Sequence, residues 1–202
     1  MSTVIAAHES PVLKVLAWEP WDGPLSPLPR TRADVYRVYG NPGVGKIDRK
    51  WERENMVTAK GLAMVPRGKL YCHKIAEPHI REGFRRASIS CPGYVLTRVG
   101  CFNFRHQRHD SKRPLSRHSW GIALDVDPDD NRGVYFKKKE TPVAFSEQWY
   151  KVWPKSIPPE FVDAMKSVGF AWGADWDEDG DSTDHTFLDP MHFELVDRSK
   201  IA

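Results

Sequence analysis

The chain has 202 residues, of which 40% are hydrophobic and 11% aromatic, a size and composition that suit one domain with a substantial core. Its net charge of +3 is only mildly basic, so we expect no nucleic-acid partner. No stretch approaches the roughly 20 apolar residues of a membrane helix, and the first residues lack the features of a signal peptide. We therefore expect a protein made in the cytoplasm without a signal peptide and without a membrane partner.

The N-terminal region is rich in proline, with prolines at positions 11, 20, 24, 27 and 29. Proline fixes φ and lacks the backbone N–H, so such a region opposes both helices and strand ladders. We predict an extended arm over residues 1–34 that lies on a single domain of residues 35–202. A separate binding module is the alternative, but the region is too short for a fold of its own.

A glycine-rich stretch at residues 40–47 matches the phosphate-binding loop pattern except at its last position. That position requires Ser or Thr to hold magnesium, and here it is Ile47. The following residues, 48–53, are highly charged and lack the apolar face of a buried helix. We interpret the stretch as a turn, with nucleotide binding as a remote alternative.

Three segments show a regular apolar pattern. Residues 69–87 carry apolar or small residues every three or four positions, which predicts a helix that Pro78 bends or restarts. Residues 94–102 are apolar and β-branched and follow a turn signal, so they predict a strand. Residues 158–168 begin with proline and end before Gly169, which predicts a short amphipathic helix.

The three cysteines, Cys72, Cys91 and Cys101, contain no CxxC pair and are odd in number. Disulfides are rare in proteins made and kept in the cytoplasm. We therefore predict buried, reduced thiols.

Residues 116–127 carry two candidate metal ligands. Apolar and acidic side chains nearly alternate from Ile122 to Asp127, which predicts a strand with Asp125 and Asp127 on one face. Gly121 allows the backbone to bend before this strand, so His118 can fold back over that face. His118 and Asp125 are thus placed to bind one metal ion.

A third ligand is expected near the C-terminus, where residues 189–196 form a loop that runs into a short strand and contain His192. Two imidazoles and one carboxylate suit a catalytic zinc, which keeps its fourth position for water and lowers the pKa of that water to about 7. We predict one zinc ion per chain, held by His118, Asp125 and His192.

Two charged stretches are interpreted as solvated loops. Residues 137–139 are three lysines, for which weak attraction to an anionic polymer is the alternative. Residues 175–181 imitate the start of a calcium loop, but its twelfth position is Thr186 and not the bidentate Glu. A weak calcium site at Asp175, Asp177 and Asp179 remains an open alternative.

The order of these motifs resembles that of the zinc D-alanyl-D-alanine peptidases and L-alanyl-D-glutamate endopeptidases of the VanY and phage-endolysin type. The resemblance covers about residues 35–196 and rests on several short motifs in the family's order. The residues that carry it are Ser116, His118, Gly121, Ala123 and Asp125, then Gly169, Phe170, Trp172, Gly173 and Trp176, and finally Asp189, His192, Phe193 and Glu194.

This resemblance implies an α+β fold of the hedgehog/D-Ala-D-Ala peptidase-like kind, in which helices pack on a small antiparallel sheet. For the general base, Asp189 is our choice, because a carboxylate three residues before His192 can reach a zinc-bound water, and relatives carry an acidic residue at this place. Glu194 is the rival, because strand alternation puts it on the same face as His192. The family has an arginine that contacts the substrate carbonyl, for which Arg105 is our choice and Arg108 the reserve. Ser116 and Trp172 are expected near the substrate, although Ser116 could instead orient His118 or cap a turn.

The implied reaction is zinc-dependent hydrolysis of a peptide bond in peptidoglycan stem peptides. Both an L-Ala-D-Glu endopeptidase and a D,D-carboxypeptidase fit the motifs, and we expect a monomer that acts on the cell wall if it is released. The rival function is an inactive, zinc-containing module that binds peptidoglycan or belongs to a virion. An open site with three protein ligands disfavours this rival, because structural zinc sites usually have four.

Overall fold

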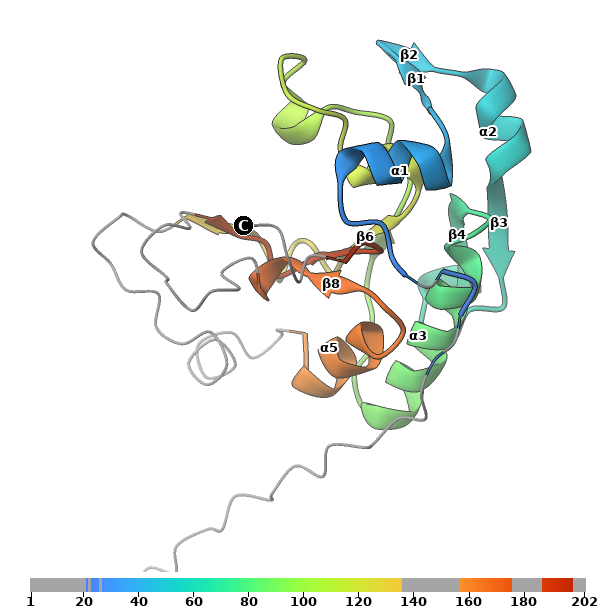
Figure 1. The fold of residues 1–202 in the computed structure, drawn as a ribbon. Coiled ribbons are helices and arrows are strands. Elements are labelled where there is room, and N and C mark those ends of the chain that lie inside the picture. The colour runs from blue at the N-terminus through green and yellow to red at the C-terminus, as the bar shows by residue number, and fades with distance from the viewer. Residues whose placement is uncertain (1–20, 22, 26, 136–156, 176–186, 198–202) are drawn as a thin grey trace, which may run out of the picture.

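The computed structural model describes residues 21, 23–25, 27–135, 157–175 and 187–197 (Figure 1). The helices among them are α1 (Arg32–Tyr39), α2 (Arg49–Asn55), α3 (Glu77–Ser90) and α5 (Pro159–Lys166). The strands are β1 (Gly43–Val44), β2 (Lys46–Ile47), β3 (Met56–Lys60), β4 (Lys69–His73), β5 (Val99–Gly100), β6 (Ala123–Val126), β7 (Val134–Tyr135), β8 (Ala171–Trp172), β9 (Phe187–Leu188) and β10 (His192–Glu194).

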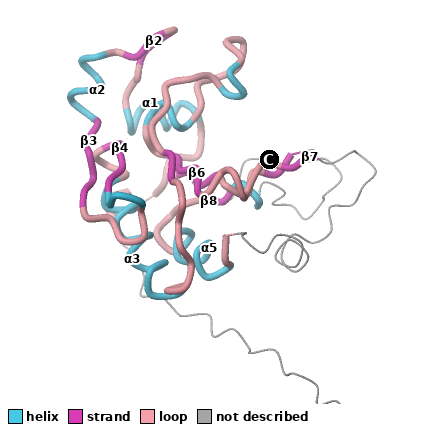
Figure 2. Tube along the Cα trace, turned by 180° about the vertical axis from the view of Figure 1, so that it is seen from behind, coloured by secondary structure: helices cyan, strands magenta, loops and turns pink. Residues whose placement is uncertain are grey.

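A small antiparallel sheet with the strand order β5-β6-β10-β8 forms the centre of the fold. Three further pairs, β1-β2, β3-β4 and β7-β9, are also antiparallel. Helices α3 and α5 lie below this sheet and α1 lies above it in both views (Figures 1 and 2). The predicted α+β class, with helices packed on a small antiparallel sheet, is confirmed.

The core lies where α3 and α5 meet the central sheet. Phe161 of α5 contacts Phe84 of α3 at a ring distance of 6.0 Å and Phe193 of β10 at 5.9 Å. All three side chains are fully buried, and burying a side chain of this size contributes about 1.5–3 kcal/mol. The helix predicted at residues 158–168 is confirmed, with Pro159 in its first turn.

The helix predicted over residues 69–87 is wrong in its first part, because Lys69–His73 form β4 and pair with β3. In β4, Leu70 and Cys72 are buried while Tyr71 between them is exposed, so this part follows the period of a strand. Helix α3 begins only at Glu77, with Pro78 in its first turn, where the missing N–H of proline costs no hydrogen bond.

The strand predicted over residues 94–102 is reduced to β5, because the carboxylate of Asp127 takes the place of a strand partner. It accepts hydrogen bonds from the backbone N–H groups of Thr97 (2.8 Å) and Arg98 (2.7 Å) and from the hydroxyl groups of Thr97 and Tyr94 (both 2.8 Å). Asp127 itself has a φ of 41° and lies beyond the end of β6. The expectation that Asp125 and Asp127 share one strand face is therefore wrong.

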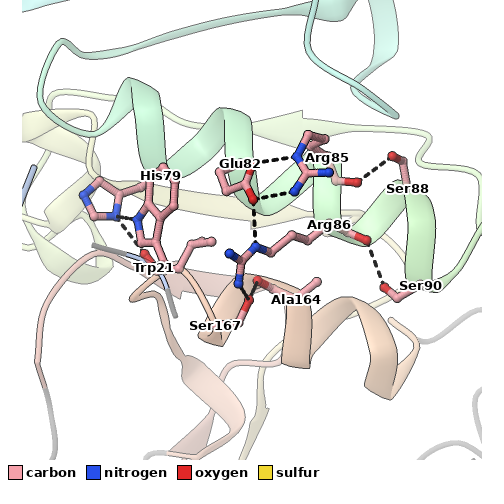
Figure 3. A network of polar contacts seen from close by, with 10 residues as sticks. Trp21, His79, Glu82, Arg85, Arg86, Ser88, Ser90, Ala164 and Ser167 are labelled. Atoms are coloured by element: carbon pink, nitrogen blue, oxygen red, sulfur yellow. Dashed lines mark hydrogen bonds and ion pairs between the residues drawn. The ribbon is translucent and has the colours of Figure 1, made fainter. Parts of the chain in front are cut away.

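The described part of the N-terminal arm lies on α3 and on the segment after β10. Figure 3 shows the indole N–H of Trp21 reaching His79 Nδ1, at 3.2 Å, and Arg86 lying between Glu82 and Ser167. Farther along, Arg30 forms an ion pair with Asp197 at 2.7 Å. Helix α1 starts at Arg32, so it crosses the domain boundary that we expected at residue 34.

Three smaller expectations concern local features. Residues 43–47 form a tight hairpin of β1 and β2, as expected of a glycine-rich turn. Cys72, Cys91 and Cys101 are buried and unpaired, which confirms the predicted thiols. Among the residues that the structure describes, no helix combines the length and apolar character needed to span a bilayer.

Candidate metal centre

Three predicted ligands, His118, Asp125 and His192, converge at the central sheet. His118 lies in a short 3-10 helix, η3 (Arg117–Trp120), whereas Asp125 lies in β6 and His192 in β10. The strand register places His192 directly opposite Asp125. One possible ligand atom from each of the three residues lies within 4.8 Å of the other two.

The ring of His118 is oriented by a backbone carbonyl. Its Nδ1 lies 2.6 Å from the carbonyl oxygen of Cys101 and must carry the hydrogen, because a carbonyl can only accept. The other nitrogen, Nε2, is buried 3.2 Å from Asp125 Oδ1 and makes no hydrogen bond within the described part of the chain. A buried ring nitrogen with a lone pair and no donor is what a metal ligand requires.

The ring of His192 is oriented by a carboxylate. Its Nε2 lies 3.4 Å from Glu194 Oε2, and its Nδ1 lies 3.2 Å from Asp125 Oδ1. Asp125 Oδ1 is therefore equally distant from the His118 and His192 rings, whose centroids are 5.1 Å apart. His118 would use Nε2 as its ligand atom and His192 would use Nδ1.

The electrostatics of the cluster suit a bound cation. Burial raises the pKa of Asp125, but its contacts with the two histidines outweigh burial and hold the pKa below its usual range. Burial lowers the pKa of His192, whereas Asp125 and Glu194 raise it to about 9. The cluster thus attracts positive charge, and two nitrogens and a carboxylate oxygen match the ligands of catalytic zinc.

Two residues of the motif fix the turn that carries His118. Ser116 is 6% exposed, and its hydroxyl accepts the backbone N–H of His118, so it caps η3. This contact favours the capping role over the substrate contact that we expected. Gly121 has a φ of 66°, and its carbonyl accepts the N–H of His73, so the chain turns sharply into β6 as predicted.

Asp189 lies on the loop before β10, beside the ligand His192. Its backbone donates to the Gly173 carbonyl (3.0 Å) and accepts from the His192 N–H (2.9 Å). A Cβ on residue 173 would collide with the Asp189 carbonyl, which explains the glycine. Asp189 Oδ1 is buried without a hydrogen-bond partner among the described residues.

The pKa of Asp189 is raised, chiefly by burial. The negative charge of Asp125 raises it further, whereas electrostatic interactions with His192, His118 and Arg105 lower it. The pKa of Asp189 therefore depends on both the ligand cluster and Arg105.

Trp172 is 8% exposed, and its indole N–H donates to the Pro190 carbonyl at 2.7 Å. Its ring also stacks on Phe193 at a centroid distance of 6.3 Å. These contacts favour a role in holding the loop of Asp189 over the substrate-binding role that we expected.

The two candidate arginines occupy different environments. Arg105 is partly buried, and its backbone is tied to η3 because its N–H donates to Ser119 Oγ (3.0 Å) and its carbonyl accepts from Ser116 N–H (2.9 Å). Arg108 is exposed and has a φ of 53° in the turn Gln107–His109. The electrostatic effect on Asp189 favours Arg105.

The motif did not single out Arg117. Its Nε lies 3.8 Å from Glu194 Oε2, and Glu194 is only 2% exposed. The signal was present in part, because strand alternation places Glu194 on the same face as His192. Its cationic partner, Arg117, lies in η3, so the sequence of β10 could not predict this ion pair.

No observation supports calcium. The carboxylate of Asp175 forms an ion pair with Lys166 at 2.5 Å. The other two candidate ligands, Asp177 and Asp179, lie outside the described residues, as do the three lysines at 137–139.

Residues 109–195 match the model of a protein family described as D-alanyl-D-alanine carboxypeptidase. The match covers a little under half of the chain and includes His118, Asp125, Asp189 and His192. No curated protein and no solved structure is significantly similar to the chain. The family match supports a zinc-dependent metallopeptidase.

Proposed function

We propose that the chain is a zinc peptidase that hydrolyses a peptide bond in the stem peptides of peptidoglycan. The convergence of His118, Asp125 and His192 on one point carries the proposal, because their ligand atoms lie within 4.8 Å of one another. Three protein ligands leave a position for solvent and substrate, as catalytic zinc sites do. The family match supports the substrate class, because the family is described as D-alanyl-D-alanine carboxypeptidase and this dipeptide ends a stem peptide.

Zinc bound by these residues would acidify a water molecule and polarise the carbonyl of the scissile bond. The chain itself supplies the proton acceptor, and Asp189 suits this role. Its Oδ1 is buried and makes no hydrogen bond within the described residues, and its backbone is fixed between Gly173 and His192. Asp189 takes the proton of the attacking water and returns it to the leaving amine.

Glu194 is the poorer candidate for the base. Its carboxylate lies beside His192 Nε2 and Arg117 Nε, and it is almost fully buried. A carboxylate engaged with two cationic or donor groups is poorly placed to accept a proton from water. Glu194 instead holds the His192 ring.

Arg105 is proposed to stabilise the negative charge that develops on the substrate carbonyl oxygen. A fixed guanidinium is suited to this task, and the deletion of comparable donors costs about 3 kcal/mol in the barrier. Its backbone ties to Ser116 and Ser119 keep it next to the turn that carries His118.

Digestion of purified peptidoglycan with the zinc-loaded protein tests the proposal. Mass spectrometry of the products identifies the bond, because an endopeptidase creates a new N-terminus at D-Glu and a carboxypeptidase releases free D-alanine. The absence of any new terminus, in a sample with one zinc per chain, would leave the structural zinc module as the better reading.

Asp189→Asn separates catalysis from metal binding. We expect the variant to keep one zinc per chain and to lose activity by about 100- to 10,000-fold, because it removes the proton acceptor and leaves the ligands intact. The matched control is Asp110→Asn, which changes an exposed carboxylate that pairs with Arg113. A fully active Asp189→Asn variant would refute the assignment.

A further inference from the structure

An ion pair between a partly buried arginine and a buried carboxylate lies beside one of the proposed metal ligands. Glu194 is 2% exposed, and the Arg117 side chain is 15% exposed, with 3.8 Å between Nε and Oε2. The same Glu194 Oε2 lies 3.4 Å from His192 Nε2. Arg117, Glu194 and His192 therefore form a chain of contacts that ends at Asp125.

The position of Glu194 calls for a compensating cation. Removing a carboxylate from water is unfavourable, and a nearby opposite charge offsets part of this cost. Glu194 forms ion pairs with Arg117 and with the His192 ring. Loss of Arg117 would remove one of the positive charges that favour the position of the Glu194 carboxylate beside the His192 ring.

The ion pair also joins the two segments that supply the histidines. Arg117 immediately precedes His118 in η3, and Glu194 follows His192 by two residues in β10. The ion pair therefore holds these two segments close together, and it also orients the ring of His192.

The two histidines depend on different acceptors for their orientation. The His118 ring is held by the backbone carbonyl of Cys101, which no side-chain substitution removes. The His192 ring is held by the side chain of Glu194, which can rotate. His192 is thus the ligand whose orientation needs a further support.

We propose that Arg117 is a positioning residue for the metal centre. It holds the Glu194 carboxylate against His192 Nε2–H, and this contact keeps His192 Nδ1 turned toward Asp125 and the ion. The inference rests on the proposed zinc site but not on the reaction. Residues behind metal ligands typically change metal affinity by about 10- to 100-fold when they are replaced.

The test measures the zinc dissociation constant of Arg117→Met by competition with a chromophoric chelator. We expect a 10- to 100-fold weaker affinity than that of the wild type. The control is Arg113→Met, which removes an exposed arginine of the preceding loop that pairs with Asp110 at 3.6 Å. It should bind zinc as the wild type does.

A spectroscopic readout distinguishes positioning from general loss of stability. In the zinc-loaded wild type, ¹⁵N NMR should find the His192 hydrogen on Nε2. In Arg117→Met this signal should broaden or divide between two ring states, whereas the Nδ1–H signal of His118 should persist. A folded Arg117→Met protein with wild-type zinc affinity and an unchanged His192 signal would overturn the inference.

If Arg117→Met does not fold, the pair Arg117→Lys and Arg117→Gln decides, because Lys retains the positive charge and Gln does not. Higher zinc affinity in the Lys variant supports the inference, and equal affinity in the two overturns it. A wild-type protein that binds no zinc would instead refute the proposed function. The two failures are therefore distinguishable.

Discussion

At the scale of single residues, the two nitrogens of each imidazole in the candidate metal centre have different roles. One nitrogen contacts an acceptor that orients the ring, and the other faces the ligand cluster. His118 gives its Nδ1–H to the carbonyl of Cys101, and His192 turns its Nε2 toward Glu194. The sequence motifs predicted which side chains converge, because the ligands stand in short, recognisable patterns. They did not predict which nitrogen would face an ion, because the Cys101 carbonyl that orients the His118 ring is a backbone group from another segment.

Replacing His118 should remove the metal, because Asp125 and His192 alone leave zinc with two protein ligands. We expect His118→Ala to fall from one zinc per chain to almost none after dialysis, as measured by atomic emission spectroscopy. His109→Asn is the control, because His109 is exposed and Asn tolerates its φ of 57°. Full zinc occupancy in His118→Ala would show that His118 is not a ligand.

At the scale of secondary-structure elements, the centre depends on a strand pair and on the turn that precedes it. The register of β6 and β10 sets His192 against Asp125, and η3 brings His118 to the same place. The turn and the loop-to-strand pattern were readable from the sequence. Strand β4 was not, because its alternating buried residues also fit a helical stripe that continues into α3.

The turn should tolerate no side chain at Gly121. Its φ of 66° disfavours other residues, and a Cβ there would lie 2.6 Å from Met56 Cε and 2.9 Å from the His73 backbone nitrogen. We expect Gly121→Ala to lower the free energy of unfolding by about 2–4 kcal/mol, as measured by urea denaturation.

Gly93→Ala is the matched control for this substitution, because nothing lies within 4 Å of a Cβ at that position. It should change the free energy of unfolding by less than about 0.5 kcal/mol. Equal effects of the two substitutions would contradict the role of the turn.

At the scale of the whole molecule, helix α1 braces both ligand segments from outside the region that matches the family. The hydroxyl of Tyr39 donates to the Leu195 carbonyl (3.1 Å), next to β10, and the indole of Trp120 in η3 donates to the Gly40 carbonyl (2.8 Å). These contacts could not be predicted from the sequence, because aromatic residues in a short helix indicate burial but not a partner.

His73 of β4, which contacts the last residue of α1, makes the stability of the fold depend on pH. His73 donates through Nε2 to the Tyr39 carbonyl (3.3 Å) and accepts the Ile75 N–H at Nδ1 (3.2 Å), so only its neutral form satisfies both contacts. Burial lowers the pKa of His73 from 6.5 to about 4. Between these values the unfolded chain takes up a proton that the folded chain does not, so stability falls as the pH decreases through this window.

The contribution of His73 is fully present above pH 6.5 and is reduced by up to about 3 kcal/mol at pH 4. We expect urea denaturation at several pH values to show this loss in the wild type and a flatter dependence in His73→Gln, which has no titrating ring. Identical slopes in the two proteins would show that His73 does not carry the effect.

The cross-strand neighbours Asp125 and His192 are 67 positions apart along the chain. An ion bound by both residues would cross-link the ends of that long segment much as a disulfide does. Strands β6 and β10 could then separate only after the ion dissociates. Zinc depletion would then shorten the lifetime of the folded protein as well as stop the proposed reaction.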